Sequence, residues 1–445
     1  MDTQYCHIGD DVLEKVPRLF QSEWGGRYRP LIIADGNTWQ VAGPFLQERF
    51  ELAASENPGK NAMPAKPYLF PAEPMLYGDE HSIAAVHRLL EGNDLLAVAL
   101  GSGTINDIVK RASYECGKPY IVVATAPSVD GYTSFGAAVS VGGFKQTLPC
   151  SAPFAVFAER SILRDAPLPM LAAGYGDLAA KVPAGADWII ADTLGVHPIQ
   201  ADIWDMIQPT LKDVLSRPSE LAARDKSVVG EVFSGLVQTG FAMQKMHDSR
   251  PASGAEHLIS HVWEMEHLCK DGIPVSHGFK VALGTLISTA MMEELFSFSG
   301  QQIATQCRRA VPVSWNERAV QIQTWVGDRP SYRQILEVSR GKFLEGEALE
   351  ARRALIIQEW EAMREKVRGR LIPFARLKEM FSLAGCPAEP SHIDVTKGLF
   401  LRGVVVSQMI RTRYTILDLM YETDMFSHVV ESLMDGKRYF RSYHP

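Results

Sequence analysis

One carboxylate and three histidines of this chain have the types and spacing that suit metal chemistry. His257 and His261 are four residues apart, which places both imidazoles on one face of a helix. Asp177 precedes them, and we expect it to lie in the first turn of a helix. His277 follows them in a glycine turn. One carboxylate and two imidazoles would accept Zn²⁺, Ni²⁺ or Fe²⁺. From spacing alone, ordinary core or surface histidines are the commoner interpretation.

A metal at such a site would assist hydride transfer. A metal-bound alcohol loses its proton near neutral pH, and a metal-bound carbonyl is polarised. A basic cluster nearby would favour a phosphorylated substrate, and Lys145 and Lys181 are the candidates. Lys181 follows Asp177 by four residues, so an ion pair on one helix face explains it equally well.

A glycine turn follows an apolar run and precedes a helical stretch. The segment Gly-Ser-Gly-Thr at residues 101–104 leads into a helix that carries Asp107. Glycines let the backbone approach an anion, and the free N–H groups of a first helical turn point at it. Thr104 would add a hydroxyl donor. The pattern predicts a phosphate site, with a tight turn that binds nothing as the alternative.

Two further segments place polar groups where strands end. Asp35 ends the first apolar run, where a carboxylate can bind the adenosine ribose and favour NAD over NADP. The alternative is a helix N-cap. Residues 125–134 follow a later strand and hold hydroxyls and Asp130. Ligands bind at this edge of open α/β sheets, so we expect the segment to reach both cofactor and substrate.

The elements that would position these groups change character along the chain. Short apolar runs alternate with helical stretches in the first third, which predicts a parallel sheet with crossover helices. Long helical periodicities dominate after about residue 160. We therefore predict an α/β domain at residues 1–162 and a helical domain at residues 163–445. The expected strands lie at 30–36, 67–70, 95–103, 120–128 and 153–158, and the expected helices at 82–92, 104–117, within 345–385 and within 393–434.

The composition narrows the class of protein. The 445 residues are 46% hydrophobic and 22% charged, with a net charge of −7 and no long basic block. This argues against nucleic acid or an anionic membrane as the main partner. The sequence has no long apolar run and no signal-peptide pattern. Its six cysteines include no CxxC pair. We expect a cytoplasmic protein without a membrane span.

The order of these motifs resembles one superfamily. They run as Asp-Gly-Asn-Thr, Gly-Ser-Gly-Thr-Ile-Asn-Asp, Thr-Ala-Pro-Ser-Val-Asp-Gly-Tyr-Thr-Ser, Gly-Asp-Leu-Ala-Ala-Lys, Ser-Gly-x-Glu-His-x-x-x-His and His-Gly. The series resembles the dehydroquinate synthase-like superfamily, which includes the iron-containing alcohol dehydrogenases. Within it, the sn-glycerol-1-phosphate dehydrogenases of the bacterial arabinose-operon type are most similar. The resemblance covers residues 30–290 and is less distinct after about residue 330.

The resemblance implies a fold and a set of residue roles. The expected fold is an N-terminal Rossmann-like α/β domain followed by an all-α domain. Asp177, His257 and His277 would hold one divalent metal, nickel or zinc. Asp130 and His261 would be the catalytic residues and would contact substrate, as would Asp177. The residues expected to contact the dinucleotide are Asp35, Asn37, Gly101, Gly103, Thr104, Ile105, Asn106, Asp107, Thr125, Ala126, Pro127, Ser128 and Ser134.

The implied activity is reduction of dihydroxyacetone phosphate to sn-glycerol 1-phosphate, within phospholipid metabolism. NAD(H) would be the preferred cofactor, with NADP(H) as the alternative, in a homodimer or larger homo-oligomer. Three alternatives stay open. They are a dehydrogenase of glycerol, another polyol or a sugar phosphate; a lyase similar to dehydroquinate synthase; and a non-catalytic ligand sensor or assembly protein that kept the fold.

Overall fold

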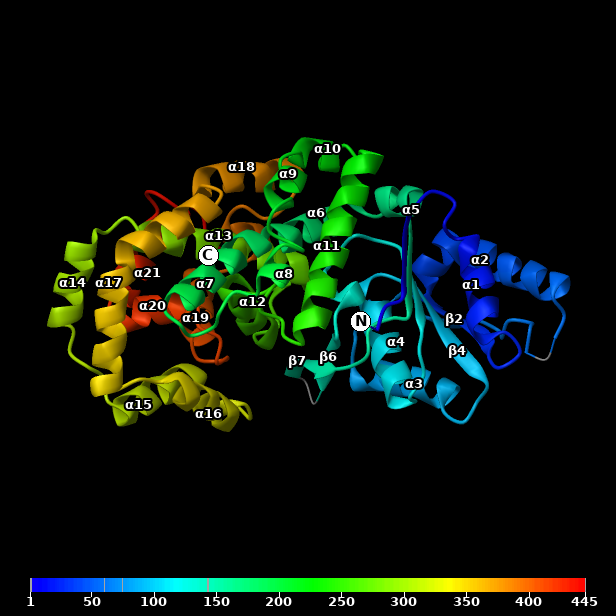
Figure 1. Cartoon of the computed structure of the whole chain (residues 1–445), viewed down its shortest axis with the longest axis horizontal. Coiled ribbons are helices and arrows are strands. Elements are labelled where there is room, and N and C mark those ends of the chain that lie inside the picture. The colour runs from blue at the N-terminus through cyan, green and yellow to red at the C-terminus, as the bar shows by residue number, and fades with distance from the viewer. Residues whose placement is uncertain (1, 60, 74, 142–143, 445) are drawn as a thin grey trace. The chain divides into compact units, whose positions relative to one another are not determined.

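Buried apolar runs of the first third form a parallel sheet in the computed structural model, which describes residues 2–59, 61–73, 75–141 and 144–444. The chain divides into two units (Figure 1). Unit 1 comprises Met1–Leu178 and Arg217–Asp248, and unit 2 comprises Ala179–Ser216 and Ser249–Pro445. The division at residue 162 stays a prediction from the sequence.

Unit 1 contains the sheet, its covering helices and a hairpin. Its strands are β1 (Tyr5–Gly9), β2 (Arg29–Asp35), β3 (Tyr68–Phe70), β4 (Leu95–Gly101), β5 (Ile121–Ala124), β6 (Gly136–Val141), β7 (Phe144–Pro149) and β8 (Ala155–Glu159). Its helices are α1 (Lys15–Trp24), α2 (Gly36–Glu56), α3 (Glu80–Leu90), α4 (Gly103–Glu115), η1 (Gly131–Thr133), α5 (Arg160–Asp165), α6 (Leu168–Ala179, of which the last residue belongs to unit 2), α10 (Pro218–Ala222) and α11 (Lys226–Met246).

The sheet has six parallel strands in the order β1-β8-β5-β4-β2-β3. The central strands β4 and β5 are buried almost throughout, as their continuous apolar sequences require. The predicted fold class and the predicted strands are confirmed. The sequence did not predict strand β1 or the antiparallel hairpin of β6 and β7.

The strand order reverses between β2 and β4. From β2 the chain moves outward to β3, and it then returns to the other side of β2 to form β4 and β5. The carboxyl ends of β2 and β4 therefore flank a topological switch point, where ligands bind in open α/β sheets. Asp35 ends β2 and Gly101 ends β4, so both predicted cofactor segments lie at this point.

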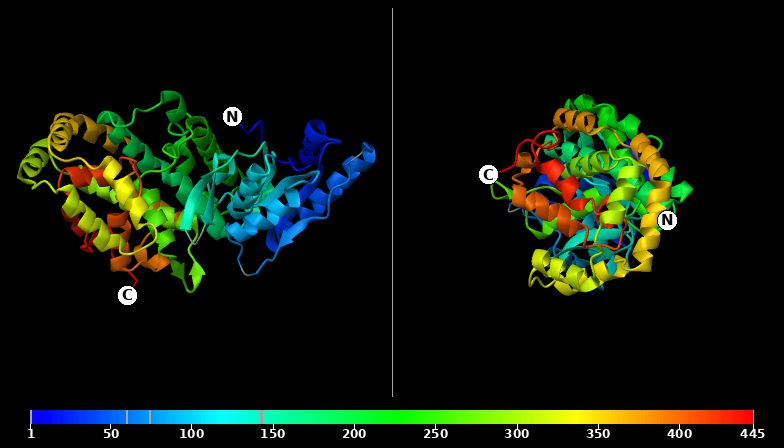
Figure 2. Two further views of the ribbon diagram at one scale, coloured as in Figure 1. Left: turned by 90° about the horizontal axis from the view of Figure 1, so that it is seen from below. Right: turned by 90° about the vertical axis from the view of Figure 1, so that its left-hand side faces the viewer.

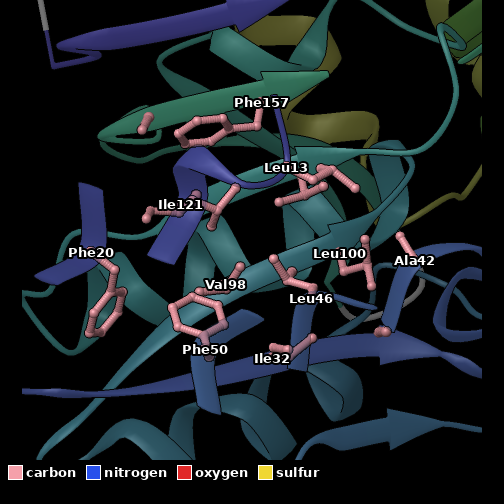
Figure 3. Close-up of a cluster of buried hydrophobic side chains, with 14 of the residues drawn as sticks. Leu13, Phe20, Ile32, Ala42, Leu46, Phe50, Val98, Leu100, Ile121 and Phe157 are labelled. Carbon is pink, nitrogen blue, oxygen red and sulfur yellow. The ribbon is translucent and has the colours of Figure 1, made fainter. Parts of the chain in front are cut away.

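One face of the sheet packs against α1 and α2 (Figure 3). Alternate strand residues such as Ile32, Val98 and Phe157 meet Phe20 from α1 and Phe50 from α2 in this core. Side chains alternate between the two faces of a strand, so the intervening residues of β2 and β4 face the other side. There α4 contacts β4 and β2, and α3 contacts β4.

Unit 2 is built almost entirely of helices, which run from green to red in Figure 2. Among its described residues, the only named strands are β9 (Cys269–Lys270) and β10 (Ile273–Pro274), which form a short hairpin. The helices are α7 (Lys181–Thr193), α8 (Ala201–Trp204), α9 (Leu211–Leu215), α12 (Ala255–Met265), α13 (His277–Leu295), α14 (Gly300–Arg309), α15 (Trp315–Val326), α16 (Tyr332–Lys342), α17 (Glu347–Arg370), α18 (Phe374–Ala384), η2 (Pro390–Ile393), α19 (Lys397–Ser407), α20 (Ile416–Glu422) and α21 (Phe426–Met434).

Local sequence explains where these helices begin and end. Ser299 and Ser314 form capping boxes at the starts of α14 and α15. The long stretch at residues 345–385 becomes two helices, because Pro373 lacks the N–H that would continue α17. The apolar stretch at residues 393–434 becomes η2 and three helices, α19 to α21.

No single helix of the described residues is long and apolar enough to cross a membrane. The buried helix α13 meets that test only when it is joined to α14 across a 92° bend.

Candidate nucleotide and metal sites

The turn between β4 and α4 has the properties of an anion site. Ser102 is the N-cap of α4 but makes no side-chain capping hydrogen bond, which leaves the first-turn N–H groups of the helix without a side-chain acceptor. A Cβ atom on Gly103 would lie 2.7 Å from Cγ2 of Val129, so glycine is needed for this close approach. The predicted phosphate turn therefore has the expected helix-start geometry.

The polar side chains that follow this turn bind the protein itself. Oδ1 of Asn106 accepts a hydrogen bond from the Tyr120 hydroxyl at 3.0 Å, and Oδ2 of Asp107 accepts one from the backbone N–H of Ala138 at 3.2 Å. Both side chains thus fix α4 to its neighbours. Their predicted contact with the dinucleotide stays a prediction.

Lys110 joins these groups into one network, and the sequence did not predict it. Its fully buried Nζ donates to the carbonyls of Gly131, Ser134 and Gly136 at 2.6, 3.1 and 3.0 Å and lies 3.8 Å from Asp107. Burial lowers the pKa of Lys110, against the opposing effect of Asp107. The lysine holds the 131–136 segment against α4. Its spacing of three residues after Asp107 was the available signal.

Asp35 is the N-cap of α2. Its Oδ1 accepts hydrogen bonds from the N–H groups of Asn37 and Thr38 at 2.9 and 2.8 Å, and the Thr38 hydroxyl accepts one from the Asp35 N–H. This capping box fixes the start of α2. The N-cap alternative is thus realised, and a contact with ribose would have to be made in addition.

Residues 125–134 lie beside the glycine turn in unit 1. The N–H of Thr125 donates to the carbonyl of Gly101, and the Tyr132 hydroxyl donates to the carbonyl of Ala126. The Ser134 hydroxyl donates within its own segment, to Gly131 and Gly136. These contacts hold the segment together and attach its start to Gly101, beside the glycine turn.

Asp177 lies in the last turn of α6, so the prediction that it begins a helix is wrong. The helix starts earlier, at Leu168, and Gly174 in its middle packs so closely on the carbonyl of Pro127 that a Cβ there would overlap it. Oδ2 of the buried Asp177 accepts a hydrogen bond from the N–H of Asp130 at 2.9 Å. Asp177 and Asp130, both predicted to contact substrate, are thus adjacent in unit 1.

The predicted basic candidates lie elsewhere. Lys181 begins α7, so it does not share a helix with Asp177. Lys145 belongs to β7, and its side chain lies outside the described residues.

Three imidazoles gather in unit 2. His257 and His261 lie on α12, with ring centroids 6.3 Å apart, and His277 begins α13. The ring of His277 lies 5.5 Å from that of His257 and 6.2 Å from that of His261. The helical spacing predicted for the first pair is therefore realised, and packing of α13 on α12 adds the third.

Two buried glutamates orient two of these rings. Nδ1 of His257 lies 2.9 Å from Oε1 of Glu256, and Nδ1 of His277 lies 2.8 Å from Oε1 of Glu264. A carboxylate oxygen that accepts from Nδ1 favours the tautomer in which Nδ1 carries the proton and Nε2 keeps its lone pair. Metal-binding histidines are commonly held in this way. The sequence analysis gave these glutamates no role, although Glu264 follows His257 by seven residues on one helix face.

Burial and neighbouring charges shift the pKa values of two residues in this cluster, Glu264 and His261. Burial alone would raise the pKa of Glu264, but His277 and Lys280 outweigh it and hold that pKa well below its usual range. Burial lowers the pKa of His261 well below its usual value, and Arg411 and the other histidines add to this effect. His261 is therefore neutral at neutral pH, in contrast to the ionised Glu264.

Asp187 anchors the start of the histidine helix. Its carboxylate accepts hydrogen bonds from the N–H groups of Ala255 and Ile416 at 2.8 and 2.6 Å. Burial and the neighbouring Glu256 raise the pKa of Asp187 well above its usual range. The side chain thus links the first turns of α12 and α20, and it fixes the position from which α12 presents its histidines.

Comparisons with known proteins first define a class. The family model described as iron-containing alcohol dehydrogenase matches residues 7–167. Two solved structures share the fold at low identity: a probable glycerol dehydrogenase from Sinorhizobium meliloti (TM-score 0.56, 15% identity, 96% of this chain and 98% of that chain) and an iron-containing alcohol dehydrogenase from Thermotoga maritima (TM-score 0.52, 12% identity, 95% and 98%). The fold is that of the iron-containing alcohol dehydrogenases.

Curated relatives then narrow this class. A glycerol-1-phosphate dehydrogenase [NAD(P)+] of Halalkalibacterium halodurans is 33% identical over 285 residues, which cover 64% of this chain and 69% of the relative. The protein of the same name from Bacillus velezensis is 34% identical over 292 residues, 65% and 71% of the two chains. The chain belongs to the glycerol-1-phosphate dehydrogenase family, whose members are metal- and NAD(P)-dependent oxidoreductases.

Proposed function

We propose that this protein reduces dihydroxyacetone phosphate to sn-glycerol 1-phosphate with NAD(P)H and one divalent metal. The similarity to relatives named glycerol-1-phosphate dehydrogenase [NAD(P)+] carries the proposal. The site chemistry supports it, because a phosphate-type turn and metal-type histidines are the two components that such a reaction needs.

Asp177, His257 and His277 would hold the metal. Their donor types, one carboxylate and two imidazoles, fit a divalent ion. The fit is supported by the two Nδ1–carboxylate hydrogen bonds, which leave both Nε2 atoms as acceptors. When bound, the ion would polarise the substrate carbonyl and stabilise negative charge on its oxygen. Carboxylate and imidazole suit nickel or zinc.

The start of α4 would receive the pyrophosphate of the dinucleotide. Gly103 permits the approach, and Lys110 keeps the neighbouring 131–136 segment in place. Asp35 at the end of β2 would face the ribose and favour NAD(H). Asp35→Asn tests this preference cleanly, because asparagine is an equally good N-cap and removes only the charge. A rise in NADPH use relative to NADH is the expected result.

The remaining roles concern the substrate and a proton. Hydride from the nicotinamide would form the new C–H bond at the carbonyl carbon, and the carbonyl oxygen would take a proton to become the hydroxyl. His261 is neutral at neutral pH, so it would accept this proton in alcohol oxidation and return it in ketone reduction. Asp130 would orient a substrate hydroxyl. Its N–H already fixes Asp177, which couples substrate and metal positions.

The decisive experiment compares dihydroxyacetone phosphate with dihydroxyacetone. Metal-stripped enzyme is reloaded with nickel or zinc, and oxidation of NADH and NADPH is followed with each substrate. We expect turnover of the phosphorylated ketone and product identified as sn-glycerol 1-phosphate. Preference for dihydroxyacetone would reassign the enzyme to a polyol dehydrogenase. Sedimentation of the same preparation tests the proposed homodimer or larger assembly, and the cytoplasmic location stays a prediction.

A further inference from the structure

A cavity of about 680 Å³ lies among α15, α17, α19, α20 and α21 of unit 2. Its volume is in the range of small-molecule pockets, roughly 300–1,000 Å³. None of its lining residues belongs to the histidine cluster or to the glutamates that orient it. It is therefore a feature apart from the proposed reaction site.

Most of the cavity wall is apolar, with aliphatic and aromatic side chains. Helices α17, α19 and α21 and the turn after α19 contribute the aliphatic residues Leu349, Leu401, Val405, Met409, Val430 and Met434. Burial of an alkyl chain against such a wall is favourable at about 25 cal/mol per Å² of apolar surface. The wall therefore favours a ligand with an extended apolar body over a sugar or a nucleotide base with many polar atoms.

A buried guanidinium lies at one part of this wall. Arg318 is only 6% exposed, and its hydrogen bonds go to the neutral amides of Gln321 and Gln408. Its guanidinium lies 4.5 Å from the centre of the Tyr421 ring. Within the described residues no carboxylate lies within 4.0 Å of it, and burial lowers the pKa of Arg318. The hydrogen-bond partners of Arg318 are neutral, and the attraction of the more distant Asp418 does not offset its burial.

A second polar group beside it lacks a partner. The Tyr421 hydroxyl is buried and makes no hydrogen bond within the described part of the chain. Glu422 also lines the cavity, but it already accepts a hydrogen bond from the Tyr414 hydroxyl at 2.6 Å and lies 3.6 Å from Arg352. Arg318 and Tyr421 are therefore the groups that an entering ligand would satisfy.

The remaining charges limit the ligand to a single negative charge. Arg353 also lines the cavity, and its Nε donates to the carbonyl of Glu422 at 2.8 Å. The carboxylates of Asp424, Glu431 and Asp435 line the cavity at exposed positions. They would repel a polyanion such as a nucleotide, whereas one carboxylate can pair with the buried Arg318.

We propose that this cavity binds an anionic amphiphile, a monocarboxylate with an alkyl chain, whose carboxylate pairs with Arg318 and Tyr421. The site is additional to the proposed dehydrogenase reaction and stands without it.

The test uses dodecanoate with the full-length protein. Calorimetric titration below the micellar concentration should show saturable binding, with dodecanol and dodecyltrimethylammonium at least about tenfold weaker. Arg318→Gln should weaken dodecanoate binding by about tenfold or more. Arg309→Gln is the matched control, because Arg309 is exposed at the end of α14 and outside the cavity.

Tyr421→Phe separates binding from folding. Its hydroxyl has no partner, so its removal should leave the melting temperature of the free protein unchanged or slightly raised. Dodecanoate binding should still fall several-fold. Val405→Trp fills the cavity and should abolish binding.

The proposal is overturned if dodecanoate fails to bind, or if Arg318→Gln and Tyr421→Phe bind it as the unmodified protein does. It is also overturned if Val405→Trp changes the oligomeric mass in light scattering without changing dodecanoate binding. A second copy of the chain would then be the occupant.

Discussion

The two units hold their functional polar groups in opposite ways. In unit 1 the motif side chains Asp35, Asn106 and Asp107 are engaged by the protein's own backbone and side chains. What the phosphate turn offers to a ligand is therefore backbone N–H groups at a helix start. In unit 2 the histidine side chains themselves are the functional groups, and carboxylates hold them by Nδ1.

The two units are therefore sensitive to substitution at different kinds of residue. A backbone site depends on close approach, so the residues that matter are glycines and the side chains that fix the loop. A side-chain site depends on the ligands and on the residues that orient them. Substitutions at the metal ligands and at the glycine turn should therefore affect different measured quantities.

His257→Ala should remove metal and turnover together. Loss of a ligand removes several kcal/mol of stabilisation, so we expect kcat/KM to fall by about a thousandfold or more. Bound metal, measured by elemental analysis, should fall with it, while NADH binding measured by fluorescence should persist because unit 1 is unchanged. His428→Ala, an exposed histidine of unit 2, is the control. A metal-free variant with normal turnover would contradict the assignment.

Glu264→Gln should weaken metal binding without abolishing it. The amide can still bond to His277 but no longer enforces the proton on Nδ1, so affinity should fall about 10- to 100-fold. Chelator competition measures the loss, and nitrogen NMR of the imidazole reports the tautomer. Glu365→Gln, an exposed change on α17, should alter neither. If the metal affinity and the His277 tautomer are unchanged in the Glu264 variant, this glutamate contributes only to packing and does not orient His277.

Gly103→Ala should affect the nucleotide and spare the metal. The new methyl would lie 2.7 Å from Val129, so the turn must shift, and we expect the KM for NADH to rise about tenfold. Metal content should stay constant. Gly59→Ala is the matched control, because a Cβ there meets nothing within 4 Å. Equal KM values for the two variants would place the pyrophosphate elsewhere.

Glu422→Gln should produce the smallest effect, on stability alone. Burial raises the pKa of Glu422 from 4.5 to about 7, so its folded form binds a proton that the unfolded form releases. Stability is therefore fully present below pH 4.5 and is lost as pH rises through about 7. The neutral variant should gain on the order of 1 to 3 kcal/mol over the unmodified protein at pH 8, and less at pH 5. Urea unfolding at the two pH values measures this, and a pH-independent gap would contradict it.

Features that depend on neighbouring residues could be predicted from the sequence. Continuous apolar runs at β2, β4 and β5 identify buried parallel strands, and the spacing of His257 and His261 fixes their shared helix face. Prediction from the sequence failed for β1 and the β6–β7 hairpin, whose sequences lack a strong apolar run. The prediction also misplaced Asp177, which lies in the last turn of α6 and not in the first turn of a helix.

Local sequence accounts for the chemical groups that are present: a glycine turn after a buried strand, and two imidazoles one helical turn apart. The residues that hold these groups in place follow from long-range packing. Lys110 reaches three carbonyls more than 20 residues away, and Asp187 caps helices 68 and 229 residues away. Neighbouring residues set helical and strand periods, whereas the elements that pack against a buried polar group set its partner.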